Sequence, residues 1–249
     1  MANPSRLDLE LNELKWWSNW AKTEMLGKNA YIMRSDDFQE SFFNRACFVD
    51  CRAFSNYRKK AEGRFRDLGL PSVLTLNEGC ASARTSLARS GYKAFETMTV
   101  MVSTDRLEPT GGEARVRRVS SGQVDEWSQA YLLSFYGDET LMPMVTPVAH
   151  RLARDPEATL LEAELNGVVA GVLALFRTRR VAGVYCVGTV PRFRRRGIAG
   201  ALLGRAGEIA SSESRRLVLQ TLKSDGAEAF YSKRGFVPAY RKAFMRQEN

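Results

Sequence analysis

The segment from Val184 to Leu203 constrains the fold more than any other part of the chain. It begins with an apolar, β-branched run that stops at Pro191, continues through an arginine cluster to Gly197, and ends in an Ala/Leu-rich stretch. This order predicts a strand, a basic glycine loop and the start of a helix. Because first-turn N–H groups lack intrahelical partners and lie at the positive end of the helix dipole, such a loop can bind a phosphate-bearing ligand.

The pattern from residue 113 onward alternates between short strands and helices. The expected strands are 114–119, 159–165, 168–177, 181–190, 216–222 and 239–246. The expected helices are 124–136, 141–154, a helix from the end of the glycine loop to about 212, and 227–234. Asn166-Gly167 between two apolar runs predicts a tight hairpin. Together these elements predict an α+β fold, in which helices wrap a mixed, mostly antiparallel sheet.

An earlier part of the chain repeats the order of the final elements. Gly91 aligns with Gly235 at an offset of 144 residues, and at the same offset Leu74 aligns with Val218. Strands and turn stay in register without gaps, which indicates an internal repeat of one fold. We therefore expect two tandem domains, 1–108 and 113–249, with a linker across Thr104 to Gly112.

The two halves of the repeat differ in their chemistry. At the offset of 144, the glycine loop falls on residues 50–55, DCRAFS, which contain neither the glycine nor the arginine cluster. The first half is instead apolar and aromatic, with Leu7, Leu11 and Leu14 at helical spacing, then Trp16, Trp17 and Trp20, and the strand-like SFFNRACFV. Such clusters could stack nucleic-acid bases, but core or interface packing is the better interpretation.

Composition sets the broader limits. The chain has 249 residues and a formal net charge of +9, which favours acidic partners without choosing among them. It contains no signal peptide and no run of about 18 uncharged apolar residues, so we expect a cytoplasmic protein that does not enter a membrane. The four cysteines lack metal-ligand spacing and are expected to be reduced thiols. His150 is the only histidine, so a zinc site or a Ser-His-Asp triad is disfavoured.

Several motifs in the second half resemble the GNAT superfamily of acyl-CoA-dependent N-acetyltransferases. They are the strand that ends in Val190-Pro191, the loop Arg194-x-x-Gly197-x-Ala199, and Ala227-x-x-x-Tyr231 followed by Gly235-Phe236. The order and spacing of loop, tyrosine and Gly-Phe make the resemblance specific. The first half is more weakly similar to the degenerate first copy of tandem members, through the repeat and FFNRA. The resemblance implies acetyl-CoA as the acyl donor and no metal.

The resemblance also implies which residues hold the coenzyme. Backbone groups of Val187 and Thr189 would pair with the pantetheine arm, and amides near Gly197 would meet the pyrophosphate, with added charge from the arginines. Ser224 stands where many members have an asparagine. The complete expected set is Val187, Thr189, Val190, Arg194, Arg195, Arg196, Gly197, Ile198, Ala199, Gly200 and Ser224.

Tyr231 is the expected catalytic residue. In the family, the tyrosine at this spacing gives a proton or a hydrogen bond to the departing CoA thiolate, and a phenol with a pKa near ~10 suits that task. The acceptor amine must also lose a proton. Four carboxylates are possible bases or acceptor-site groups, namely Asp138, Glu139, Glu162 and Glu164, although a carboxylate at any one of these positions is more often an ordinary surface group.

Three functions therefore remain open at this point. The leading hypothesis is transfer of an acetyl group from acetyl-CoA to a primary amine by direct attack in a ternary complex. The second is a non-catalytic acyl-CoA sensor or partner module, and the third is nucleic-acid binding, for which no recognition motif is present. The protein is expected to act as a monomer or homodimer.

Overall fold

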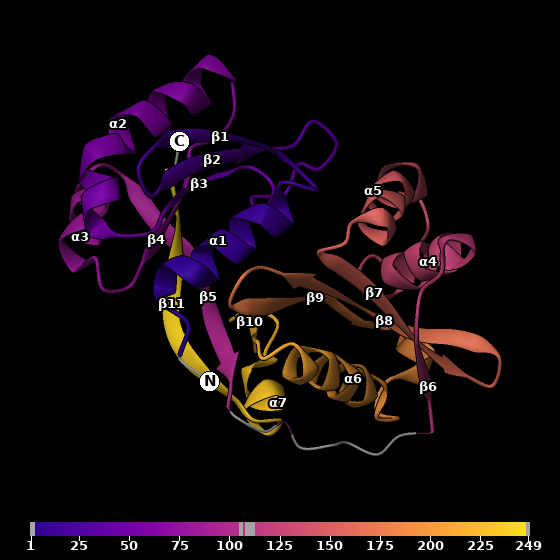
Figure 1. The fold of residues 1–249 in the computed structure, drawn as a ribbon. Helices are drawn as coiled ribbons and strands as arrows, with labels where there is room; N and C mark the ends of the chain where they lie inside the picture. The colour runs from indigo at the N-terminus through magenta and orange to yellow at the C-terminus, as the bar shows by residue number, and fades with distance from the viewer. Residues whose placement is uncertain (1–2, 105–106, 108–112, 248–249) are drawn as a thin grey trace. The chain divides into compact units, whose positions relative to one another are not determined.

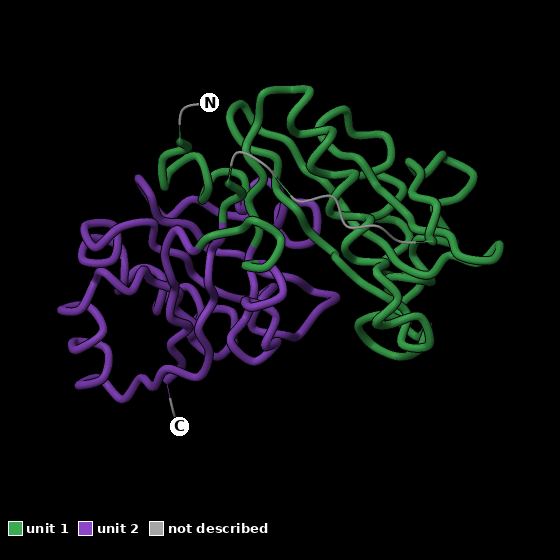
Figure 2. Tube along the Cα trace, turned by 90° about the horizontal axis from the view of Figure 1, so that it is seen from below, with its two compact units in different colours: residues 1–12, 102–219, 232–237 green, residues 13–101, 220–231, 238–249 purple. Residues whose placement is uncertain are grey.

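The computed structural model describes residues 3–104, 107 and 113–247 (Figure 1). Most of the expected linker, Thr104 to Gly112, lies outside the described residues. The chain forms two compact units, each built from separate stretches (Figure 2). Unit 1 contains residues 1–12, 102–219 and 232–237, and unit 2 contains 13–101, 220–231 and 238–249. Neither unit is one continuous stretch, and the division into domains 1–108 and 113–249 stays a prediction.

Unit 1 contains a five-stranded arrangement in the order β10-β9-β8-β7-β6, of which β9 and β10 are parallel and the other pairs antiparallel. Helices α4 and α5 cover one face and α6 covers the other (Figure 1). The strands are β6 (Arg115–Arg118), β7 (Ala158–Leu165), β8 (Val168–Arg177), β9 (Val181–Thr189) and β10 (Arg216–Leu222), whose last three residues belong to unit 2. The helices are α4 (Val124–Phe135), α5 (Met142–Arg154) and α6 (Ile198–Ser212), with 3-10 turns at Ser121–Gln123 and Pro191–Phe193.

Unit 2 has strands in the order β1-β2-β3-β4-β11-β5, with β3 and β4 parallel. The carboxy-terminal strand β11 pairs with β4 antiparallel, from Lys242 opposite Asn77 to Arg246 opposite Val73. The strands are β1 (Lys22–Gly27), β2 (Ala30–Arg34), β3 (Arg45–Phe48), β4 (Val73–Asn77), β5 (Tyr92–Ser103) and β11 (Phe236–Gln247). The helices are α2 (Cys51–Asp67), α3 (Ala81–Arg89) and α7 (Glu228–Ser232), and α1 (Arg6–Trp17) belongs to unit 1 up to Asn12.

The predicted fold class is confirmed. Both units are α+β with mostly antiparallel pairs and one parallel pair joined by a crossover helix, β3-α2-β4 in one and β9-α6-β10 in the other. β5 spans 92–103 and β11 spans 236–247, so the two strands have the same bounds at the offset of 144. The predicted hairpin also forms, because Asn166 and Gly167 both adopt the positive φ that a tight two-residue turn requires.

Two expectations for the first half differ from the structure. Trp16 and Trp20 are core residues as expected, but Leu7 and Leu11 are exposed, because α1 buries the opposite face that carries Leu9 and Trp16. The strand expected within SFFNRACFV is confined to β3, because the Asn44 side chain binds the carbonyl oxygens of Phe38 and Glu40 and holds the preceding residues in a turn.

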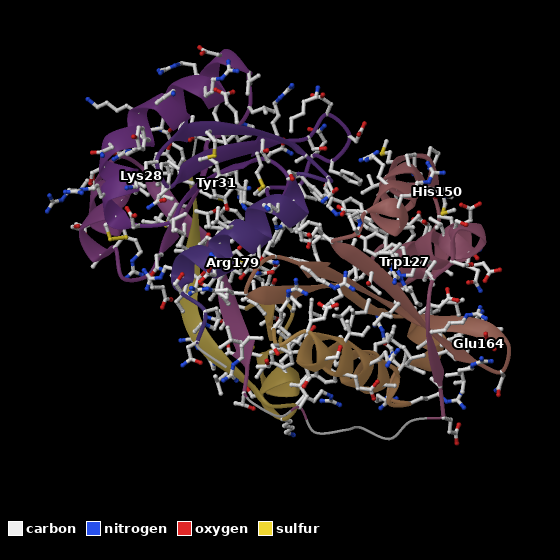
Figure 3. The ribbon with its side chains drawn as sticks, in the orientation of Figure 1. Lys28, Tyr31, Trp127, His150, Glu164 and Arg179 are labelled. Carbon is white, nitrogen blue, oxygen red and sulfur yellow. A yellow bond between two sulfur atoms is a disulfide. The ribbon has the colours of Figure 1, made fainter. Side chains whose placement is uncertain are left out.

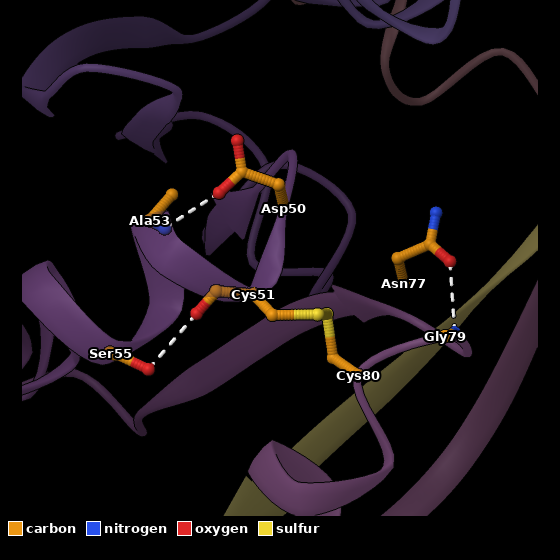
Figure 4. Close-up of a disulfide and its surroundings, with 7 residues drawn as sticks. All are labelled: Asp50, Cys51, Ala53, Ser55, Asn77, Gly79 and Cys80. Atoms are coloured by element: carbon orange, nitrogen blue, oxygen red, sulfur yellow. Dashed lines mark hydrogen bonds between the residues drawn. A yellow bond between two sulfur atoms is a disulfide. The ribbon is translucent and has the colours of Figure 1, made fainter.

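The expectation of reduced thiols is wrong for two of the four cysteines. Cys51 and Cys80 form a disulfide with their Cα atoms 5.3 Å apart (Figure 4). Cys51 begins α2 after β3, and Cys80 precedes α3 after β4, so the parallel pairing of β3 and β4 brings the two helix starts together. A separation of 29 residues gives no sequence signal for this pairing. Cys47 and Cys186 are free thiols.

Among the described residues, no helix is long and apolar enough to cross a membrane. Within the same part of the chain, no three His, Cys, Asp or Glu side chains are grouped as metal ligands.

Candidate functional site

The central strand β9 changes its pairing halfway along. Its parallel pairs with β10 end at Val184 opposite Leu219. On its other side, β9 has one extra residue between the pairs that Tyr185 and Gly188 make with β8, and Cys186 adopts a φ of 52° there. This is a β-bulge, which bends the strand and disrupts the ladder. Past Val184, among the described strands, β9 has no ladder partner on its β10 side, so an extended ligand could pair with it.

The loop after β9 leads directly into α6. Pro191 opens a 3-10 turn, and Arg195 and Gly197 then adopt φ values of 63° and 79°. Gly197 is the N-cap of α6 in the left-handed conformation, where a side chain would add strain. The amides of residues 198–200 belong to the first turn, and in the described chain they have no backbone acceptor. The structure thus contains the predicted strand, glycine loop and helix N-terminus.

The three loop arginines are exposed but differ in their contacts. Arg194 donates to the carbonyl oxygens of Thr189 at 3.4 Å and Ser134 at 3.2 Å, and so connects the loop to the end of α4. Arg196 lies 3.7 Å from the exposed carboxylate of Glu113. Positive charge is therefore concentrated at the N-terminus of α6, where it adds to the helix dipole in favouring an anion.

Two glycines that the sequence analysis did not single out set the spacing around this loop. A Cβ on Gly171 of β8 would lie 2.5 Å from Ile198 Cγ2 and 2.7 Å from the Gly188 carbonyl oxygen. A Cβ on Gly188 of β9 would lie 2.7 Å from Ser134 Cβ. The start of α6 and the end of α4 therefore approach the sheet from opposite faces, and only glycine permits that contact. Ile198 is buried against β8, so only its backbone can face a ligand.

Asn12 was also missed by the sequence analysis, because an isolated asparagine in an amphipathic helix carries no signal. Its side chain is fully buried, donates to the carbonyl oxygen of Phe176 at 3.0 Å and accepts from the Tyr185 hydroxyl at 2.8 Å. These bonds hold α1 against β8 and β9 immediately before the bulge.

Two of the four candidate bases are in β7. Glu162 is buried, and its Oε1 accepts from Arg117 Nε at 2.5 Å, whereas its Oε2 is buried with no hydrogen-bond partner in the described structure. Burial raises the pKa of Glu162 above its ordinary value, although Arg117 opposes the shift. Glu162 opposes Val172, which opposes Gly188, so it shares a row of the sheet with the β9 site. Glu164 is paired with Arg117 at 3.1 Å toward the hairpin end (Figure 3).

The other two candidate bases are in the turn between α4 and α5. Asp138 is exposed, and the hydrogen bond from the Thr140 amide lowers the pKa of its carboxyl group. Glu139 is exposed and accepts from the Gln129 amide group at 2.7 Å. His150 in α5 lies 3.2 Å from Asp125 and is not part of the β9 site (Figure 3).

Tyr231 and Ser224 belong to unit 2. Tyr231 is half-buried in α7, with its ring 5.2 Å from that of Phe230. Glu228 fixes α7 to the strands of unit 2, because it accepts from the Thr99 hydroxyl at 2.9 Å and from Arg241 at 3.0 Å. Ser224 is exposed in the turn that precedes α7.

A β-bulge, a left-handed glycine and a basic helix N-terminus follow one another in the order that the resemblance to GNAT proteins predicts, and the sequence comparison agrees. Residues 123–236 match the model of the acetyltransferase (GNAT) family. This match covers the carboxy-terminal part of the chain, which therefore resembles the GNAT acetyltransferase family. None of the curated protein sequences matches it.

Solved structures of low sequence identity share the fold over nearly the whole chain. A GCN5-related N-acetyltransferase from Kribbella flavida is 15% identical, with a TM-score of 0.72 over 100% of this chain and 97% of that one. A GCN5-related N-acetyltransferase from Sphaerobacter thermophilus is 17% identical, with a TM-score of 0.70 over 98% and 94%. A functionally unknown conserved protein from Staphylococcus epidermidis is 13% identical, with a TM-score of 0.66 over 96% and 99%. The amino-terminal half is therefore part of a fold found in other full-length proteins.

Proposed function

We propose that this protein transfers the acetyl group of acetyl-CoA to a primary amine. One observation carries the proposal. The pairing of β9 with β10 ends at Val184, and the chain then runs from this unpaired end of β9 into the left-handed Gly197 at the start of α6. An extended pantetheine arm would pair with Val187 and Thr189, and the pyrophosphate would meet the amides of residues 198–200. Arg194 to Arg196 would supply charge, and Ser224 is the expected side-chain contact to pantetheine.

The reaction proceeds by direct attack. The neutral amine adds to the thioester carbonyl, the carbon–sulfur bond breaks, and the departing thiolate takes a proton from the Tyr231 hydroxyl. A backbone N–H of the β9 bulge would polarise the carbonyl. Cys186 lies within the bulge and is the nearest potential nucleophile, but burial raises the pKa of its thiol. A protonated thiol is a poor nucleophile, which supports a ternary complex over an acyl-cysteine intermediate.

We infer that Glu162 is the best of the four candidate bases. Its raised pKa and its unpartnered Oε2 suit proton acceptance, either directly or through water. The lowered pKa of Asp138 makes that carboxylate a weaker base, and Glu139 is engaged by Gln129. Glu164 lies toward the hairpin end of β7 and outside the row of the sheet that contains Glu162 and Gly188. The cytoplasmic location expected from the sequence stays a prediction, and the Cys51–Cys80 disulfide does not favour it, because such bonds form mainly in oxidising compartments.

The test is release of CoA thiol from acetyl-CoA across a panel of amines, with the chain and with Tyr231→Phe. The proposal predicts turnover on at least one amine class, and a fall in kcat of about 10- to 1,000-fold in the variant with acetyl-CoA affinity retained. Unchanged turnover in Tyr231→Phe would remove the tyrosine from the mechanism. Calorimetric binding of acetyl-CoA with no thiol release on any amine would favour the alternative, a non-catalytic sensor.

A further inference from the structure

The amino-terminal copy has no room for a coenzyme loop. β3 ends at Phe48 and α2 begins at Cys51, whereas β9 ends at Thr189 and α6 begins at Ile198. The tight connection between β3 and α2 leaves no segment that could surround a pyrophosphate. The Asp50 carboxylate also caps the helix, because it accepts from the Ala53 amide at 2.7 Å. A negative charge therefore lies where a phosphate would have to bind.

The disulfide is a second obstacle to a phosphate at the start of α2 (Figure 4). It joins Cys51, the first residue of α2, to Cys80, the N-cap of α3. At the offset of 144, Cys80 corresponds to Ser224, the expected pantetheine contact of the other copy. A ligand of the amino-terminal copy would have to bind elsewhere.

Unit 2 contains a cavity of about 910 Å³ at a different place in its fold. The cavity is formed by the second half of α2, the segment that leads into β4, the start of β5 and the end of β11. It is within the size range of ligand sites, about 300–1,000 Å³. Its polar and charged lining includes Arg58, Glu62, Arg66, Ser72, Tyr92 and Arg246.

Three arginines line this cavity and one carboxylate opposes them. Glu62 is already engaged, because its Oε1 accepts from Arg58 Nε at 2.7 Å. Arg58 is also held between the rings of Phe54 and Tyr92. Arg66 and Arg246 are exposed, and no carboxylate of the described residues pairs with either of them. Arg246 also lies over the Phe95 ring, at 4.8 Å from its centroid. Two arginines without a paired carboxylate thus line one cavity, an arrangement that suits bidentate binding of an oxyanion.

The remaining lining indicates the rest of the ligand. Phe65 is buried and Leu70 is half-buried, so the cavity has apolar surface beside the arginines. The Tyr92 hydroxyl donates to the Ser72 hydroxyl at 2.8 Å, which leaves the Ser72 hydroxyl free to donate to a bound anion. We propose that unit 2 binds a small oxyanion, a phosphate or carboxylate carried on an apolar body, in this cavity.

The test uses the full chain and calorimetric titration with phenyl phosphate, benzoate and inorganic phosphate in low-salt buffer. The double variant Arg66→Ala/Arg246→Ala is compared with Arg52→Ala/Arg89→Ala, which removes the same charge from exposed arginines of the same unit, including one in the last turn of a helix. The proposal predicts binding that the first variant weakens at least tenfold and the second changes less than twofold. Comparison of the probes distinguishes a phosphate preference from a carboxylate preference.

Hydrogen exchange on the unmodified chain provides a second readout if the double variant does not fold. Phenyl phosphate or benzoate is expected to slow exchange in residues 58–72 and 243–247, and not in residues 50–56. The proposal is overturned if none of the probes binds at millimolar concentration, if both double variants lose affinity equally, or if protection falls outside the cavity segments. Acetyl-CoA binding at Gly197 is tested separately, so failure here leaves the proposed transferase function intact.

Discussion

Lys242 Nζ lies 2.5 Å from Oε2 of Glu13, 229 positions away in the sequence, and both side chains are buried. Arg45 binds the other carboxylate oxygen at 2.7 Å, and its guanidinium lies over the rings of Trp17 and Phe244. One buried carboxylate therefore pairs with cations from both β3 and β11. The carboxy-terminal strand is thereby fixed in the core of unit 2 by charge as well as by its ladder with β4.

Replacing Glu13 by Gln is expected to destabilise unit 2 strongly. The substitution removes the carboxylate that pairs with two buried cations, and removing one partner of a buried ion pair costs about 3–5 kcal/mol. Denaturant unfolding followed by tryptophan fluorescence measures it, since Trp16, Trp17 and Trp20 are in or near this core. Glu24→Gln is the matched control, because the exposed pair of Glu24 with Arg64 is worth about 0–1 kcal/mol. Equal losses in the two variants would contradict the ion-pair account.

The same carboxylate makes stability depend on pH. Burial works against ionisation of Glu13, but the charges of Lys242 and Arg45 prevail and hold its pKa below the ordinary value of 4.5. Because the pKa of Glu13 is lower in the folded state, its ion pairs contribute fully to the free energy of unfolding above pH 4.5. This contribution is lost as the pH falls through the folded-state pKa. The stability gap between the wild type and Glu13→Gln is therefore expected to be constant near neutral pH and to shrink well below pH 4.5. A gap that widened on acidification would have the wrong sign.

The disulfide is expected to stabilise unit 2. Cys51 and Cys80 are 29 positions apart, and closure of this loop in the unfolded chain predicts about 3–4 kcal/mol. Cys51→Ser/Cys80→Ser should lose this amount in denaturant unfolding without reductant. Adding a dithiol should then destabilise the wild type toward the variant and leave the variant unchanged. If the dithiol shifts both proteins alike, the effect does not arise from this bond.

Gly171→Ala tests the close approach of α6 to β8. The new Cβ would meet Ile198 Cγ2 and a backbone oxygen, so a loss of about 1–3 kcal/mol is expected, together with weaker acetyl-CoA binding as α6 moves. Gly204→Ala is the control, because nothing lies within 4 Å of its Cβ position in α6. That change should be neutral or stabilise by about 0.5–1 kcal/mol. Thermal unfolding and calorimetry on both variants measure the difference. If Gly171→Ala lost neither stability nor acetyl-CoA affinity, α6 would not be packed as closely on β8 as the structure shows.

Elements whose signal is local could be predicted from the sequence. The segments 168–177 and 216–222 became β8 and β10 with the predicted bounds, because apolar runs bounded by turn residues define them. Gly197 could be assigned to the helix start because its neighbours are an arginine cluster and an Ala/Leu run.

Features that depend on distant contacts could not be predicted. The Cys51–Cys80 bond needs the parallel pairing of β3 and β4, and the partners of Glu13 come from opposite ends of the chain. The exposure of Leu7 and Leu11 likewise depends on which face of α1 meets the rest of the fold. Apolar residues at helical spacing show that a helix has an apolar face, but they do not show which face is buried in the fold.

The most direct measurement is a calorimetric titration of the full chain with acetyl-CoA, repeated with Gly197→Glu. The account predicts one molecule bound per chain. Of the two crossover helices in the described structure, α6 begins with a left-handed glycine and with amides that have no backbone acceptor, whereas the start of α2 is closed by Asp50 and the disulfide. Gly197→Glu should abolish binding, since it adds strain at a φ of 79° and a negative charge at the phosphate position. Two molecules bound per chain, or full affinity in the variant, would contradict it.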